Sequence, residues 1–327
     1  MITLETDTQV ALKNILFATD FSRGADAALP YAVSLARQHG AMLHAAHVIS
    51  SEPHLFVAPE SWPALMRAEE DWAIARVVSL AKKLRGVPHS ALARAGDVWN
   101  VLRRFIEERD IDLLVIGTHG KSSLPEFPMG STAEKLLRHA PCPVLTVAVN
   151  ACHRSEGEPV FKSILFATNF TPASLSALPY AITVARKHQA QLLLLHVLER
   201  PAADVESTAA FLSKRLQDLV PAEAGLRYHP KSLVEIGSPV ERILESADYH
   251  CADMIVMGVR PADGKFGATR LAGTVQKVTA RANCPVLTVH GDVPADWQPQ
   301  LRDYASEFQP DSGTFLDCSA AQHAQCG

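Results

Sequence analysis

The sequence of 327 residues lacks the features that mark membrane, nucleic-acid-binding and secreted proteins. No apolar run approaches the roughly 18 residues needed to cross a bilayer. The formal net charge of −4 provides no basic surface of the kind that binds nucleic acid or an acidic membrane. The N-terminal MITLETDTQVALK is acidic and has no uninterrupted apolar core, so it does not match a secretory signal. We therefore expect a cytoplasmic protein with neither nucleic acid nor membrane as a partner.

Metal-binding patterns are also absent from the sequence. The six cysteines form no CxxC pair and no metal-type spacing. Cys142 and Cys284 stand in the near-identical contexts APCPVLTV and ANCPVLTV, which are typical of a buried thiol at the start of a strand. The histidines show no repeated ligand spacing. We predict no metal site, and the scattered thiols favour a reducing compartment.

The familiar catalytic motifs are missing. The chain has no GxxxxGK[ST] loop, because Gly258 and Gly264 are wrongly spaced before Lys265 and Phe266 occupies the hydroxyl position. It has no HExxH, no GxSxG and no evident pair of carboxylates. We assign no catalytic residue, although slow hydrolysis of ATP with Mg²⁺ remains an alternative function.

What the chain does contain is a duplication. KNILFATDFS at 13–22 returns as KSILFATNFT at 162–171, LPYAVSLARQHGA at 29–41 as LPYAITVARKHQA at 178–190, and PCPVLTV at 141–147 as NCPVLTV at 283–289. This predicts two homologous domains at about 1–150 and 160–290, a polar linker at 151–159, and a flexible C-terminal tail at 291–327.

Short apolar runs and helical spacings alternate within each half. In the first half, strands are expected at 14–18, 42–48, 90–95, 113–117 and 144–148, with helices at 25–39, 63–84, 98–108 and 131–139. In the second half, Ser238, Pro239 and Glu241 predict a capping box at the start of a helix. Such alternation predicts a doubly wound α/β domain, Rossmann-like or flavodoxin-like, with a parallel sheet of about five strands in each half.

The segment GTHGKSSLPEFPMGST at 117–132 suggests a phosphate site. Ligands of doubly wound sheets lie beyond the carboxyl ends of the strands, where the strand order reverses. Glycine lets backbone amides approach an anion, and Gly130-Ser131 opens a helix whose N-terminus favours phosphate. Asp20, after the first strand, is placed to accept hydrogen bonds from ribose hydroxyls. Lys121 supplies the loop's cation, and Glu126 opposes phosphate binding unless it points outward or helps hold Mg²⁺.

These residues resemble the universal stress protein family, here as a tandem of two domains over roughly 10–149 and 160–290. ATP-binding members carry Gly, two residues, Gly, nine residues, Gly and then Ser or Thr, a spacing that Gly117, Gly120, Gly130 and Ser131 match. The family's acidic residue falls on Asp20 and its adenine contact on Val48. The resemblance implies ATP binding and pairing of the two halves through their last strands; whether two chains form a homodimer stays open. The predicted site is Ala18, Thr19, Asp20, Val48, Gly117, Thr118, His119, Gly120, Lys121, Gly130, Ser131 and Thr132.

Structural explanations compete with these assignments. Ser131-Thr-Ala-Glu134 is also a capping box, Asp20 is suited to capping the turn into the first helix, and His119 is commonly a turn residue. The second half lacks two of these ligand-binding residues. Asn169 replaces Asp20, and Pro261 replaces the second glycine of the loop that leads to Gly273-Thr274. We predict a degenerate site there.

Three functions therefore stay open on the sequence. The first is a stress-response regulatory protein that binds ATP in its N-terminal half. The second is a slow ATPase, and the third is a nucleotide-free chaperone-like or interaction module.

Overall fold

The structure, a computed structural model, describes residues 10–50, 61–84, 86–120, 129–149, 151, 158–201, 204–259 and 272–291. These residues belong to one compact unit, Met1–Val293. The predicted tail after Gly291, most of the predicted linker, Lys121 and Glu126 lie outside the described residues.

The first half alternates strands and helices as the sequence predicts. Its elements are β1 (Asn14–Ala18), α1 (Arg23–His39), β2 (Met42–Ser50), α2 (Trp62–Lys83), β3 (His89–Gly96), α3 (Val98–Glu108), β4 (Leu113–Gly117), α4 (Ser131–His139) and β5 (Val144–Val147). Several expected boundaries are met to the residue, and the others shift by one or two positions, where helix and strand ends fray.

The second half repeats this order. Its elements are β6 (Ser163–Ala167), α5 (Pro172–Leu175), α6 (Leu178–His188), β7 (Gln191–Leu198), α7 (Val205–Asp218), the 3₁₀ turn η2 (Ala222–Ala224), β8 (Lys231–Ile236), α8 (Pro239–Tyr249), β9 (Met254–Val259), α9 (Ala272–Arg281) and β10 (Val286–His290). The α/β fold class is confirmed.

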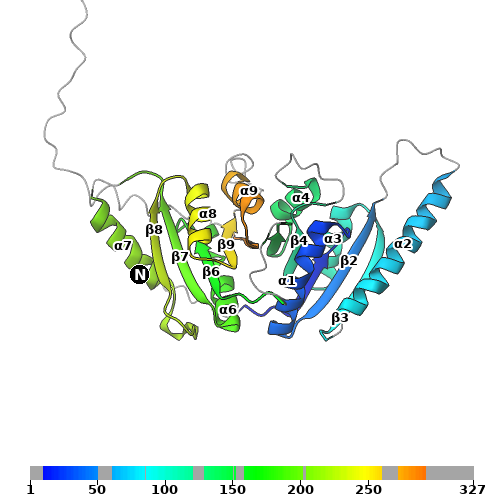
Figure 1. The fold of residues 1–327 in the computed structure, drawn as a ribbon, viewed down its shortest axis with the longest axis horizontal. Helices are drawn as coiled ribbons and strands as arrows, with labels where there is room; N and C mark the ends of the chain where they lie inside the picture. The colour runs from blue at the N-terminus through cyan, green and yellow to red at the C-terminus, as the bar shows by residue number, and fades with distance from the viewer. Residues whose placement is uncertain are drawn as a thin grey trace, which may run out of the picture. The chain divides into compact units, whose positions relative to one another are not determined.

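The ten strands form one sheet in the order β3-β2-β1-β4-β5-β10-β9-β6-β7-β8. Neighbours within each half are parallel, and β5 pairs antiparallel with β10. The chain therefore contains two five-stranded parallel sheets joined along their last strands (Figure 1). In each half the first strand lies between the second and the fourth, so the strand order reverses beside β1 and beside β6.

Helices cover both faces of the first half's sheet. Ala32 and Leu35 of α1 and Leu80 of α2 are buried in one apolar core, while Leu102 of α3 and Leu136 of α4 are buried in the other. A sheet covered on both faces requires strands that are apolar at every position, which explains the uninterrupted runs in the sequence.

The two halves pack within one chain, and the strands that join them are tied by reciprocal side-chain bonds. Thr146 of β5 donates through Oγ1 to the Val286 carbonyl at 3.1 Å, and Thr288 of β10 donates to the Val144 carbonyl at the same distance. Both hydroxyls are buried, so they satisfy carbonyls that water does not reach.

One predicted cap does not form. Ser238 is the N-cap of α8 but makes no side-chain capping bond. The capping box predicted with Glu241 is wrong because that carboxylate accepts two hydrogen bonds from Arg281 of α9, each 2.8 Å long. The bidentate guanidinium competes successfully for the carboxylate.

None of the helices in the described ranges combines the length and the apolar composition that a bilayer-spanning helix requires.

Candidate functional site

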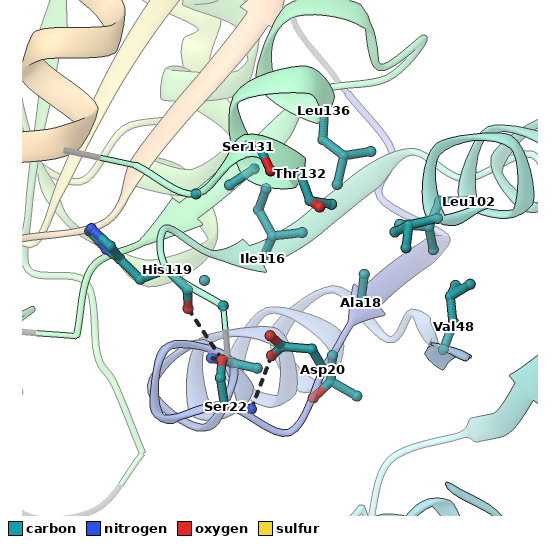
Figure 2. A pocket seen from close by; sticks show the side chains of 18 residues that line it. Ala18, Asp20, Ser22, Val48, Leu102, Ile116, His119, Ser131, Thr132 and Leu136 are labelled. Atoms are coloured by element: carbon teal, nitrogen blue, oxygen red, sulfur yellow. Dashed lines mark hydrogen bonds between the residues drawn. The ribbon is translucent and has the colours of Figure 1, made fainter. Parts of the chain in front are cut away.

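A cavity of about 180 Å³ lies beyond the carboxyl ends of β1, β2 and β4, where the strand order reverses (Figure 2). The N-terminal ends of α3 and α4 close its other side. Of the predicted site residues that the structure describes, all but Thr118 line it. Its described lining is Ala18, Thr19, Asp20, Ser22, Ala25, Ala46, Val48, Val98, Leu102, Ile116, Gly117, His119, Gly120, Gly130, Ser131, Thr132, Ala133 and Leu136.

The turn after β1 places Asp20 at the cavity. One carboxylate oxygen of Asp20 accepts the Ser22 amide at 2.9 Å. Ser22 is the N-cap of α1, because its Oγ accepts the Ala25 amide at 3.2 Å. The alternative structural role for Asp20 is therefore present as well: the side chain closes the turn into α1, with the cap itself supplied by Ser22. Closing this turn leaves a carboxylate at the cavity wall.

Gly117 lacks a side chain for a reason the sequence did not reveal. A Cβ at this position would lie 2.4 Å from the carbonyl carbon of Gly24 and 2.6 Å from its oxygen. A Cβ on Gly24 would in turn lie 2.2 Å from the His119 oxygen. The two glycines let the first turn of α1 pack against the end of β4. Close packing against α1 therefore requires a glycine at position 117.

The N-terminus of α4 opens into the cavity without a side-chain cap. Gly130 is the N-cap and makes no side-chain hydrogen bond, and Ser131 is the first helical residue. The alternative capping box is wrong, because Glu134 pairs instead with Arg138 at 2.7 Å. The first turn of this helix thus presents main-chain amides and the hydroxyls of Ser131 and Thr132. Such a turn attracts anions.

The opposite wall is apolar. Val48, at the end of β2, lies near Leu102 of α3, and Ile116 of β4 and Leu136 of α4 continue the wall (Figure 2). Sequence reasoning found Val48 but missed the others. Leu102 and Leu136 are placed on inward helix faces by their spacing, yet only the fold shows that these faces reach the cavity. Apolar walls with a few polar groups are typical of small-molecule sites.

Thr118 and His119 support the site from its edge. Thr118 is fully buried, and its carbonyl accepts the Gly130 amide at 2.9 Å, which joins the two ends of the β4–α4 loop. The His119 carbonyl accepts the Ser22 hydroxyl at 3.2 Å. Figure 2 shows the His119 ring turned away from Asp20. Asp20 is the one carboxylate among the described lining residues.

A second cavity, of about 330 Å³, lies at the same place in the second half. Asn169 stands where Asp20 does, and its Oδ1 accepts the Thr171 hydroxyl at 2.7 Å. Glu199, directly after β7, adds a carboxylate to the wall. Gly273 is the second residue of α9, whereas Gly130 precedes α4 as its N-cap. The degenerate loop itself falls on residues outside the described ranges, so that prediction is untested.

Comparison with known proteins gives two matches to the model of the universal stress protein family, over residues 11–148 and 161–290. A universal stress protein of Thermus aquaticus is 38% identical over 138 residues, which cover 40% of this chain and 99% of that protein. One of Mycolicibacterium smegmatis is 26% identical over 299 residues, 84% of this chain and 96% of that protein. The crystal structure of one from Archaeoglobus fulgidus, 21% identical, has a TM-score of 0.70 and covers 86% of this chain and 99% of that one. At that identity the likeness concerns the fold.

Proposed function

Because the chain belongs to the universal stress protein family, we propose that it is a stress-response regulatory protein that binds ATP in the cavity of its first half. The observation that carries this proposal is the uncapped N-terminus of α4, which faces the same cavity as the Asp20 carboxylate and an apolar wall. A nucleotide offers one group to each of these three surfaces.

Each part of the nucleotide has a matching surface. The adenine ring would pack on Val48 and Leu102, where apolar side chains favour a flat, weakly hydrated ring. The ribose hydroxyls would donate to Asp20. The phosphates would accept hydrogen bonds from the main-chain amides of Ser131 and Thr132 and from the Thr132 hydroxyl, with the helix dipole of α4 adding to the attraction.

Mg²⁺ would enter with the triphosphate. Asp20 is the sole carboxylate in the described lining, and we assign it to the ribose. The ion would then reduce the repulsion between the phosphates and this carboxylate, with its ligands drawn from phosphate oxygens and water.

The two halves would pair with each other as the two subunits of a dimer do, through the antiparallel contact of β5 with β10.

The test is calorimetric titration of the full chain with ATP and Mg²⁺. We expect binding by the wild type and at least a tenfold weaker affinity in Asp20→Ala, because the variant loses a charged acceptor of the ribose hydroxyls. Asn169→Ala, at the same place in the second half, is the matched control and should leave the affinity of the first cavity unchanged. A wild type that shows neither heat of binding nor a raised melting temperature in excess ATP contradicts the proposal.

A further inference from the structure

We propose that His47 is a positioning residue for the first cavity: it holds the Thr19 carbonyl and the Phe21 ring, and so fixes the turn that presents Asp20. This inference rests on the proposed function for its ligand. His47, Phe21 and the side chains packed on them lie behind the turn and do not line the cavity.

Three polar groups of Thr19, its amide, its hydroxyl and its carbonyl, each make a hydrogen bond. Its amide donates to the Ala46 carbonyl at 2.9 Å, which continues the pairing of β1 with β2 beyond the end of the strand. Its Oγ1 accepts the Phe21 amide at 2.9 Å. Its carbonyl contacts Nδ1 of His47 at 2.7 Å. A carbonyl oxygen can only accept, so His47 carries a proton on Nδ1 and donates it here. His47 is a buried residue, 7% exposed, so its surroundings hold the ring in place.

Phe21 has a backbone conformation that a phenylalanine rarely adopts. Its φ of 58° lies in the left-handed region, which is unfavourable for residues with a Cβ. Packing holds it there: its ring centroid lies 4.7 Å from that of His47 and 5.5 Å from that of Trp72, and the Arg76 guanidinium lies 4.8 Å from it. Strained backbone persists only where its surroundings over-determine it. Asp20, between Thr19 and Phe21, is thereby fixed on both sides.

The second half builds the same arrangement from its own residues. Nδ1 of His196 contacts the Thr168 carbonyl at 2.9 Å, and the Phe170 amide donates to Thr168 Oγ1 at 2.9 Å. Phe170 has a φ of 60°, its ring lies 4.7 Å from His196, and Arg215 lies 4.4 Å from it.

The groups that face the two cavities differ more than the groups behind them. Asn169 replaces Asp20, and Leu195 replaces Ala46. The turn forms with either an acid or an amide at its centre, so its shape comes from the histidine and phenylalanine behind it. The residue at the centre is left to contact the ligand.

The experiment compares ATP affinity among substitutions of the histidines in the full chain. His47→Leu removes the donor and keeps apolar bulk, so the Thr19 carbonyl loses its partner, and we expect about tenfold weaker binding. His47→Asn restores a donor near the position of Nδ1 and should recover affinity to within about threefold of wild type. His47→Gln, whose donor reaches the position of Nε2, should not recover it. His196→Leu removes the corresponding histidine donor in the second half. It is the control and should leave the ATP affinity of the first cavity unchanged.

Several outcomes overturn the inference. If His47→Leu binds ATP as wild type does, or if the asparagine and glutamine variants bind equally, His47 does not position the site. The comparison of asparagine with glutamine keeps the test decisive if the leucine variant fails to fold. If the wild type itself binds no ATP, the proposed function fails, and hydrogen exchange then tests the positioning. The Ser22 amide, held by Asp20, should exchange at least tenfold faster than in the wild type in His47→Gln, within about threefold of the wild-type rate in His47→Asn, and at the wild-type rate in His196→Leu. Equal exchange in all of these proteins would refute it.

Discussion

Acid should destabilise this protein through a pair of histidines that the fold brings together. His39 ends α1 and His188 ends α6, and their ring centroids lie 6.4 Å apart. Phe161 packs edge-on against His188 at 4.8 Å. The Nε2 atoms of both histidines are buried, and within the described part of the chain neither has a hydrogen-bond partner. These surroundings stabilise the neutral form of each imidazole.

The pKa of each side chain is lowered from 6.5 to about 4, in His188 by burial and in His39 mainly by burial, with smaller contributions from the charges of His188, Lys187 and Arg186. Since the folded-state pKa is depressed, the unfolded chain takes up protons first as the pH falls. Stability is therefore lost progressively from about pH 6.5 down to about pH 4. At pH 5 the loss is about 2 kcal/mol for each histidine, or about 4 kcal/mol for the pair.

Urea unfolding at pH 7.5 and pH 5.0 measures this loss. The double variant His39→Phe/His188→Phe keeps rings at both positions and cannot be protonated, so its stability should fall by about 2–4 kcal/mol less than that of the wild type. The lowered pKa values of His44, His196 and His290, each due mainly to burial, supply the pH dependence that both proteins share. His229→Gln, at an exposed position, is the control. The reasoning is refuted if the double variant loses as much stability as the wild type.

Two further predictions concern glycine and cysteine. Gly117→Ala should destabilise the fold by about 1–3 kcal/mol in urea titrations, because its Cβ would meet the Gly24 backbone. Gly273→Ala should be neutral or stabilise by up to about 1 kcal/mol, because position 273 is inside α9 and, among the described residues outside its own stretch of helix, no atom lies within 4 Å of where the Cβ would be. Equal effects would count against the packing explanation. Burial raises the pKa of the Cys142 thiol to about 12, whereas Cys251 is exposed. Peptide mapping after treatment of the native protein with iodoacetamide at pH 8.5 should therefore find Cys251 modified and Cys142 intact. Rapid labelling of Cys142 would contradict its burial.

The sequence predicted which residues gather around this cavity better than it predicted their structural roles. The match of Gly117, Gly120, Gly130 and Ser131 to a family spacing, with Asp20 after the first strand, located the cavity that the structure contains. Capping boxes were less well predicted. The box predicted with Glu241 and the alternative box with Glu134 both fail to form, because Glu241 pairs with Arg281 of another helix and Glu134 pairs with Arg138 one turn along its own helix.

The sequence by itself determined the duplication, the alternation of strands and helices, and the burial of the strands on both faces. These features follow from hydrophobic patterns that a strand or helix carries within its own length. Only the tertiary structure decided that Gly117 makes room for α1, that Leu102 reaches the cavity, and that His47 lies behind Asp20. Each of these depends on contacts between segments far apart in the chain, and the side chains and backbone of one segment carry no local signal of what the other will place against them.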